Sequence, residues 1–349
     1  MRTPKCPSCK SFSCIRKGVR RGCLKYLCKD CHQWFQLNRG KRKIKPLDAL
    51  MQHLGGYSYR TLGEMAGVSA PTAYRYSKLA QDRLAHCVDI TRKYCTHFCG
   101  ILLVDGKYLS VGDRDRKVPV IYGIDYLTHD IPHYRLAKSE NYLSCLNFFR
   151  SLRLANYPLS ALVCDDNVNI RDACLKIYPK TTVQLCQNHY KENIRHLLRV
   201  RTDDTHVTFV KDLEFLFKKK LPLAEFDRLA ERILLKHQAD PVRVSIMLDI
   251  EKRKPYLLAY TQNKAIPRTN NLIELYNSHL EGRLKTIKGF DSFPHADTWL
   301  NAYFIRRRLK PFTSCSGKFK YLNKKSSLQV STGGLNLKTV ICPRSVKTR

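Results

Sequence analysis

Acidic residues are scarce in this 349-residue chain, which has 29 Asp and Glu against 63 Lys and Arg and a formal net charge of +34. After Asp297 there is no acidic residue at all. Hydrophobic residues still make up 43% of the chain, which excludes a disordered polycation because a core can be buried. The excess of positive charge favours a large polyanion as partner. We expect this partner to be nucleic acid; the alternatives are that the chain is a ribosomal protein or a membrane-surface protein.

Long apolar runs are also missing. No segment approaches the roughly 20 apolar residues that cross a bilayer, and the basic start is not followed by the apolar stretch of a secretory signal. The 15 cysteines are odd in number and scattered, unlike a secreted disulfide framework. We therefore expect a cytoplasmic, nucleoid-associated protein without membrane contact, in which some cysteines hold metal.

Four N-terminal cysteines form two C-x2-C knuckles, Cys6 with Cys9 and Cys28 with Cys31, separated by 18 residues. This spacing is typical of one structural Zn²⁺ bound by four thiolates, which folds a segment too small to have its own core. Two further cysteines between the knuckles could compete as ligands, and we treat them as bystanders: Cys14 and Cys23. The expected unit is a zinc-ribbon-like DNA-binding module over residues 1–42.

A helix-turn-helix is predicted at residues 57–76, inside a DNA-binding domain expected over 43–95. Gly67 permits a tight turn, Ser69 can cap the second helix, and Pro71 is tolerated in the first turn of that helix. An ordinary helical hairpin is the alternative. In the DNA-reading interpretation, the second helix presents four side chains to the major groove: Thr72, Tyr74, Arg75 and Lys78.

From residue 101 the pattern changes to an α/β unit. Three strands that can pair antiparallel are followed by helix, strand, helix and strand, at residues 101–111, 118–126, 131–136, 141–154, 160–165, 169–178 and 182–186. This is the element order of the RNase H-like fold. We predict an RNase H-like catalytic domain over 98–300 with an all-helical insertion at about 191–268, and a basic tail over 301–349. The lysine run at 218–220 is expected on a solvated face, with DNA contact as the alternative.

Three carboxylates stand where such a fold could bring them together. Asp105 follows the apolar run of the first strand, and Asp165 ends the buried strand that should lie next to it. A carboxylate beside buried strands is costly unless it is paired or bound to metal. Glu274 lies beside the apolar face of a later helix. Around it are side chains suited to a DNA backbone: Asn270, Asn271, Asn277, Arg283 and Lys285.

Together these residues resemble a DDE transposase of the bacterial insertion-sequence and Mutator-like type. The resemblance covers roughly 103–290. It rests on the Asp-Gly pair at Asp105, the strand ending in Asp165, the Cys-x2-His pair Cys186 and His189, and the Thr-Asn-Asn-Leu-Ile-Glu motif ending at Glu274. One departure is Asp166, where the family often has Gly, so Asp166 competes with Asp165 as the ligand. Cys186 and His189 are expected to be buried and to organise the junction with the insertion, or to form half a zinc site.

The resemblance implies two Mg²⁺ ions (or Mn²⁺) held by Asp105, Asp165 and Glu274, with Asp105 bridging. It implies strand cleavage at the ends of a mobile element and strand transfer into target DNA. Double-stranded DNA is the expected partner, and joining two ends suggests a homo-oligomer, at least a dimer. The alternative is a DNA-binding regulator derived from a transposase, without catalytic activity. A structural RNA-binding protein would not explain the three carboxylates.

Overall fold

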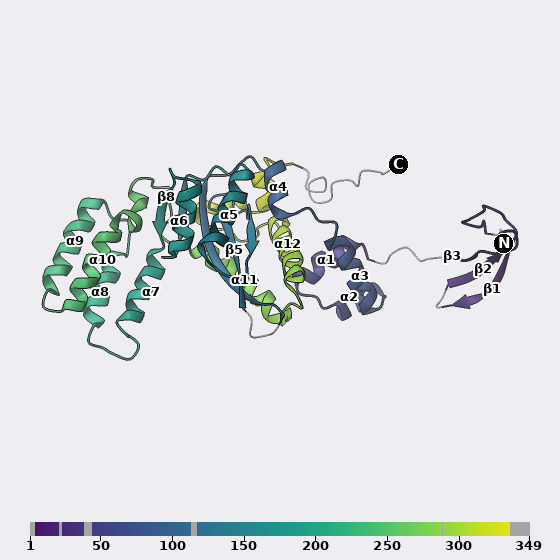
Figure 1. The fold of residues 1–349 in the computed structure, drawn as a ribbon, viewed down its shortest axis with the longest axis horizontal. Coiled ribbons are helices and arrows are strands. Elements are labelled where there is room, and N and C mark those ends of the chain that lie inside the picture. Colours follow the sequence, from purple (N-terminus) through teal and green to yellow (C-terminus); the bar gives the residue numbers. More distant parts are fainter. Residues whose placement is uncertain (1–3, 21–22, 38–43, 113–116, 288, 336–349) are drawn as a thin grey trace. The chain divides into compact units, whose positions relative to one another are not determined.

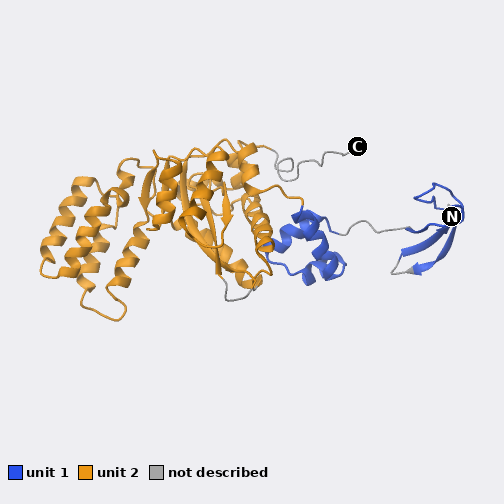
Figure 2. Cartoon of the chain, viewed as in Figure 1, with its two compact units in different colours: residues 1–82 blue, residues 83–349 orange. Residues whose placement is uncertain are grey.

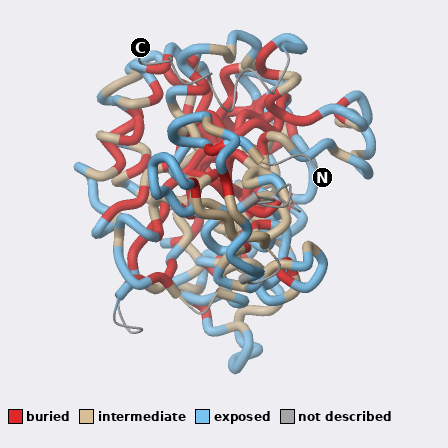
Figure 3. The backbone as a smooth tube through the Cα atoms, turned by 90° about the vertical axis from the view of Figure 1, so that its right-hand side faces the viewer, coloured by how far each residue is buried: buried red, intermediate tan, exposed pale blue. Residues whose placement is uncertain are grey.

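The computed structural model describes residues 4–20, 23–37, 44–112, 117–287 and 289–335. The chain forms two compact units, residues 1–82 and 83–349, which are coloured separately in Figure 2. Buried stretches of the backbone can be followed in red in Figure 3. Residues 1–3, 21–22 and 38–42 of the predicted zinc module and residues 336–349 of the predicted tail lie outside the described residues.

The N-terminal segment is a small antiparallel sheet of β1 (Cys14–Arg20), β2 (Cys23–Cys28) and β3 (Trp34–Leu37). Tyr26 of β2 pairs with Phe35 of β3, and the two rings stack with their centroids 5.7 Å apart. They pack against the buried Cys6, Cys14 and Cys28. The apolar content of this segment is therefore small, and the cysteines form most of its core.

Three helices complete the first unit: α1 (Pro46–Gly55), α2 (Tyr59–Ala66) and α3 (Ala70–Gln81). The predicted turn is present, since Gly67 ends α2 in the left-handed conformation with φ 58°. Gly63 of α2 lies so close to the turn that a Cβ there would be 2.6 Å from the Val68 carbonyl oxygen. One detail differs from our prediction: the Ser69 hydroxyl contacts the Thr72 hydroxyl at 2.9 Å and accepts no backbone amide.

The second unit is built on a mixed five-stranded sheet with the order β6-β5-β4-β7-β8 (Figure 1). β4 and β5 are antiparallel, as are β5 and β6, whereas β7 and β8 run parallel to β4. This arrangement fits the predicted RNase H-like core, and it confirms that the strands carrying Asp105 and Asp165 are neighbours. The strands are β4 (Ile101–Ser110), β5 (Lys117–Asp125), β6 (Tyr134–Leu136), β7 (Ala161–Cys164) and β8 (Thr182–Leu185).

Helices cover this sheet because its central strands are apolar on both faces; every residue of β7 is buried. α5 packs on β5 and β6, α6 packs on α5 and β7, and α11 packs on β4. The helices of the core are α4 (Cys87–Tyr94), α5 (Tyr142–Leu154), α6 (Val168–Ile177), α11 (Asn271–Ile287), α12 (Phe293–Leu309), α13 (Ser327–Ser331) and the short 3-10 helix η2 (Gly317–Leu322).

The predicted insertion is helical throughout, as Figure 1 shows. It begins at Gln187 rather than 191, and its helices are α7 (Gln187–Leu197), α8 (Val207–Leu216), α9 (Leu223–Lys236), α10 (Pro241–Leu257) and the short η1 (Ala259–Thr261). The buried Gln184 fastens it to β8, donating to the Leu257 carbonyl at 2.9 Å and accepting from the Tyr260 amide at 3.0 Å. Lys220 is exposed, but its ammonium donates to the Ile266 carbonyl at 3.0 Å.

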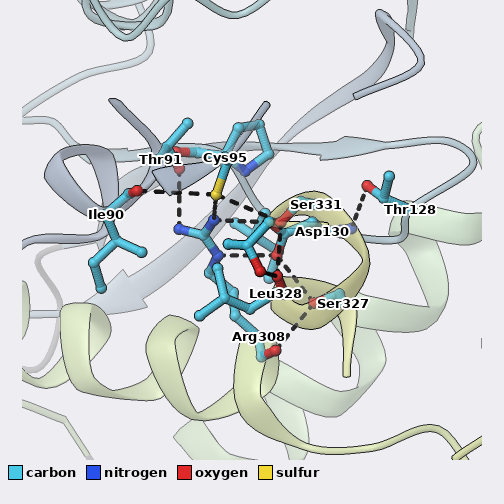
Figure 4. A network of polar contacts seen from close by, with 12 residues as sticks. Ile90, Thr91, Cys95, Thr128, Asp130, Arg308, Ser327, Leu328 and Ser331 are labelled. Carbon is cyan, nitrogen blue, oxygen red and sulfur yellow. Dashed lines mark hydrogen bonds and ion pairs between the residues drawn. The ribbon is translucent and has the colours of Figure 1, made fainter. Parts of the chain in front are cut away.

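Residue 301, where the sequence suggested that a tail begins, lies inside α12. Arg308 of the same helix is fully buried and binds the equally buried Asp130 through two hydrogen bonds of 2.9 and 2.7 Å (Figure 4). Ser327 and Ser331 donate to the same carboxylate, at 3.0 and 2.6 Å. The network joins α12 and α13 to the turn after β5, so the folded core continues well past residue 301.

Candidate active site

Asp105 and Asp165 lie close together where the inner strand β7 ends beside β4. Leu103 of β4 pairs with Val163 of β7. Asp105 lies two residues after Leu103, and Asp165 lies two residues after Val163. The parallel register therefore brings the two carboxylates to the same level, as the sequence analysis predicted. They line one open cavity together with Glu140 and His189.

The environment of Asp105 is electrostatically unfavourable for a bare carboxylate. Burial is the main cause that raises its pKa to about 7, and repulsion from Asp165 adds to it. Two donors partly compensate: the Asn277 side-chain amide at 2.5 Å and the Gly106 backbone amide at 2.8 Å. Tyr122 in turn donates to the Asn277 oxygen at 2.7 Å, which fixes the orientation of that amide. A cation between the aspartates would relieve the repulsion.

Asp165 is held from two sides. The buried Asn270 donates to its Oδ1 at 2.6 Å, and Nδ1 of His189 lies 2.6 Å from the same oxygen. The close carboxylate is the main cause that raises the pKa of His189 to about 11, so the imidazole is charged. Asp165 thus has a fixed orientation beside Asp105.

Glu274 reaches the same site through His189. Its Oε1 lies 3.7 Å from His189 Nε2, so one imidazole lies between the carboxylates of Asp165 and Glu274. Glu274 stands in the first turn of α11, and its side chain is 42% exposed. The third predicted carboxylate is therefore near the pair, with its side chain partly exposed.

Cys186 and His189 play different parts. Cys186 is buried, as predicted, and its sulfur accepts from the Asn270 backbone amide at 3.4 Å. His189 is not buried, which differs from our prediction, because it faces the acidic cavity from the start of α7. Asp165, Cys186 and His189 bring their ligand atoms within 4.8 Å of one another.

Asp166, the alternative to Asp165 as a metal ligand, forms an ion pair with the helical insertion. Its carboxylate pairs with Arg253 of α10, and the same guanidinium holds Asp249 at 2.9 Å. Tyr190 of α7 donates to Asp249 at 2.8 Å. Asp166 thus ties the insertion to the end of β7, which favours Asp165 as the carboxylate that works with Asp105.

Glu140 is a further acidic residue in the cavity that the sequence analysis missed. It accepts from Asn167 at 2.7 Å and from Tyr108 at 3.0 Å. A Cβ on Gly106 would be 2.8 Å from its carboxylate, so the glycine after Asp105 leaves room for Glu140. Gly106 was the only sequence feature that indicated a close contact after Asp105, and it did not show that Glu140 makes this contact.

The residues predicted to contact DNA fall into two groups. Asn270 and Asn277 differ from our prediction, because their side chains orient the two aspartates. The others lie at least partly exposed, several with protein partners: Lys78 pairs with Asp82 at 3.0 Å, Lys285 with Glu281 at 3.1 Å, and Asn271 accepts from Asn188 at 2.9 Å. Thr72, Tyr74 and Arg75 line up along α3, and Arg283 lies in α11.

The four knuckle cysteines converge as predicted. The sulfurs of Cys6 and Cys31 are 3.6 Å apart, those of Cys9 and Cys28 are 3.4 Å apart, and all four lie within 4.8 Å of one another. Four thiolates around one Zn²⁺ at about 2.3 Å would be about 3.8 Å apart, so the set fits a tetrahedral site. Both knuckles end in the same left-handed turn, at Lys10 with φ 63° and His32 with φ 55°.

Comparison with protein families matches residues 77–301, more than half of the chain, to the family described as Transposase, Mutator family. The chain belongs to the Mutator family of transposases. The match spans Asp105, Asp165 and Glu274 together with the helical insertion. No curated protein matches the chain. In the described residues of this transposase, we find no helix that is long and apolar enough to span a membrane.

Two solved structures show weak likeness to this transposase. The simian T-cell lymphotropic virus intasome in complex with PP2A regulatory subunit B56 gamma is 11% identical, covering 54% of this chain and 67% of that chain, with a TM-score of 0.22. The pre-cleavage Mos1 transpososome is 12% identical, covering 42% of this chain and 60% of that chain, with a TM-score of 0.17. At these scores the likenesses add nothing to the family match.

Proposed function

We propose that this transposase is a DDE-type enzyme that cleaves DNA at the ends of a mobile element and joins the ends to target DNA. The observation that carries the proposal is the pairing of Asp105 with Asp165 across β4 and β7, with Glu274 next to them through His189. Asp105 and Asp165 line one cavity of a strongly basic protein, and Glu274 lies beside His189, which lines the same cavity.

The site suits divalent cations with oxygen ligands. Asp105, Asp165 and Glu274 supply hard carboxylate oxygens, which Mg²⁺ and Mn²⁺ prefer. The raised pKa of Asp105 supports this assignment, because its carboxylate is buried next to a second carboxylate. When bound, two such ions supply an activated attacking oxygen and stabilise the leaving oxygen.

The protein's own residues would set the geometry of the reaction. Asn277 and Asn270 orient the aspartate carboxylates, and His189 holds Asp165 near Glu274. In the first step, water attacks the phosphorus at the element end, and the 3′-oxygen leaves and takes up a proton. In the second, that 3′-hydroxyl attacks a target phosphorus and displaces the target's 3′-oxygen. One phosphodiester replaces another, so the second step requires no nucleotide hydrolysis.

The first unit would hold the DNA. The four-thiolate set would bind one structural Zn²⁺, and α3 would present Tyr74, Arg75 and Lys78 to the major groove. We propose double-stranded element ends and target DNA as partners, with at least two copies of the chain acting together. A non-catalytic regulator is the second candidate, because the same DNA-binding elements would serve it.

Substitution of Asp105 separates these candidates. We expect Asp105→Asn to abolish Mg²⁺-dependent nicking and strand transfer on a plasmid carrying the flanking sequences of the coding region, while DNA binding in a gel-shift assay is retained. Asp172→Asn, which changes an exposed aspartate of α6, is the matched control and should cleave normally. Cleavage retained by Asp105→Asn would refute the role of Asp105, whereas no cleavage by the unmodified protein would favour the regulator.

A further inference from the structure

A second cavity lies on the other side of α11 from the carboxylates and has a volume of about 570 Å³. Glu274 and Asn277 of α11 face the acidic site, whereas Leu272, Leu275 and His279 line this cavity. An α-helix with side chains is about 10–12 Å across. The cavity is therefore close enough to the carboxylates to receive a neighbouring part of the same DNA strand.

The cavity has aromatic walls. The ring of His129 lies tilted by 58° against that of Phe319, with centroids 4.4 Å apart, and meets Phe312 edge-on at 5.6 Å. Tyr126 meets Phe319 edge-on at 5.5 Å. These rings come from the turn after β5 and from the segment around η2, which are far apart in the sequence. Flat aromatic surfaces of this kind stack on nucleobases of any sequence.

Positive charge surrounds the rings. Arg307 lies 4.7 Å over the ring of Tyr276, and Lys318 lies 4.4 Å over the ring of Tyr126. Lys310 is exposed at the rim. Every residue lining the cavity belongs to the described part of the chain, and none of them is Asp or Glu. The cavity is therefore complementary to an aromatic ligand that carries negative charge.

One buried polar atom points to a ligand. His129 is only 6% exposed and lines the cavity, and its Nε2 has no hydrogen-bond partner among the described residues. The His129 backbone amide donates to the Asp125 carbonyl at 2.9 Å, and the His129 carbonyl accepts from the Tyr276 hydroxyl at 3.0 Å. The residue has a left-handed backbone with φ 54°. Burial and Lys318 lower its pKa to about 4.

We propose that this cavity binds one unpaired nucleotide of the DNA strand being processed. The base would stack among Phe319, Phe312 and Tyr126, next to the His129 ring, with its phosphate near Arg307 and Lys310. This inference rests on the proposed function, because it places the nucleotide next to the phosphate held at Asp105. Holding a nucleotide outside the duplex would fix the register of the strand at the carboxylates.

Photocrosslinking of the unmodified full chain tests the proposal directly. The probe is a DNA duplex with a single-stranded 3′ overhang that contains 5-iodouracil, in Ca²⁺ to prevent cleavage. We expect crosslinks on Phe312, Phe319 or Tyr126, mapped by mass spectrometry. Bound probe that crosslinks only elsewhere overturns the proposal and leaves the proposed function intact. If no DNA binds, both fail.

Matched variants give an independent measurement. We expect Phe319→Leu to weaken binding of the overhang probe by about 5- to 100-fold, the range for losing one stacked base. Arg307→Gln and Lys310→Gln should also weaken it, because each removes a positive charge near the phosphate. Binding of the blunt duplex should change by less. Phe215→Leu and Arg232→Gln remove an exposed ring and an exposed charge elsewhere and serve as controls.

Thermal unfolding establishes that the variants are folded. Lys310→Gln, at the exposed rim, should leave the melting temperature unchanged. Cavity variants that bind the overhang as tightly as their controls would overturn the proposal. An acidic aromatic peptide, the other chemistry that the cavity fits, would then be the ligand to examine.

Discussion

At the scale of single residues, the site depends on amides that keep two repelling carboxylates in place. Asn277 contacts Asp105 and is itself fixed by Tyr122, while Asn270 and His189 hold Asp165. None of these donors needs to touch DNA. Residues that orient metal ligands typically change metal affinity or activity by about 10- to 100-fold when they are removed.

We therefore expect Asn277→Ala to lower Mg²⁺-dependent cleavage by about 10- to 100-fold, because Asp105 loses the amide that orients it. Higher Mg²⁺ should restore part of the rate, and DNA affinity should not change. Ser278→Ala, one residue further along α11, removes only a hydroxyl that donates to the Glu274 carbonyl and serves as the control. Equal rates for the two variants would show that Asn277 does not position Asp105.

At the scale of elements, two helical glycines have different surroundings: one lies against the backbone of a neighbouring turn, and the other has open space around it. Gly63 of α2 lies against the turn before α3, where a Cβ would be 2.6 Å from the Val68 carbonyl. Gly282 of α11 has open space around its Cβ position. The same substitution should therefore have opposite effects on stability at the two sites.

We expect Gly63→Ala to destabilise the first unit by about 1–3 kcal/mol, because the close packing of the turn must open. Gly282→Ala should instead stabilise the second unit by about 0.5–1 kcal/mol, because alanine costs less entropy than glycine inside a helix. Calorimetric unfolding of the full chain measures both. A loss of stability with Gly282→Ala, or no change with Gly63→Ala, would contradict this account of the packing.

At the scale of the whole molecule, the sequence predicted what local patterns encode. The apolar strands, the turn at Gly67 and the two cysteine knuckles each have a short-range signature, and Asp105 and Asp165 followed from strand order. Other features depend on long-range placement. The run Arg306, Arg307 and Arg308 looks solvated in the sequence, yet the register of α12 turns Arg308 into the core and Arg307 toward the cavity. Glu140 could not be placed without its tertiary contacts.

The buried ion pair of Arg308 and Asp130 gives a prediction for the stability of the second unit. Both side chains are fully buried, and the guanidinium also donates to the Cys87 carbonyl and the Thr91 hydroxyl, each at 3.0 Å. Arg308→Met would leave the Asp130 carboxylate buried with only the hydroxyls of Ser327 and Ser331 as hydrogen-bond donors among the described residues. We expect a loss of about 3–5 kcal/mol in the free energy of unfolding, measured by urea titration.

The double variant Arg308→Met with Asp130→Asn should regain part of that loss, because it no longer buries an unpaired charge. Lys320→Met, which removes an exposed charge from η2, should change stability by less than about 0.5 kcal/mol. If Arg308→Met and Lys320→Met unfold at the same urea concentration, the pair does not hold α12 and α13 to the sheet. If the double variant is less stable than Arg308→Met alone, the Asp130 charge is satisfied by its serine partners without the arginine.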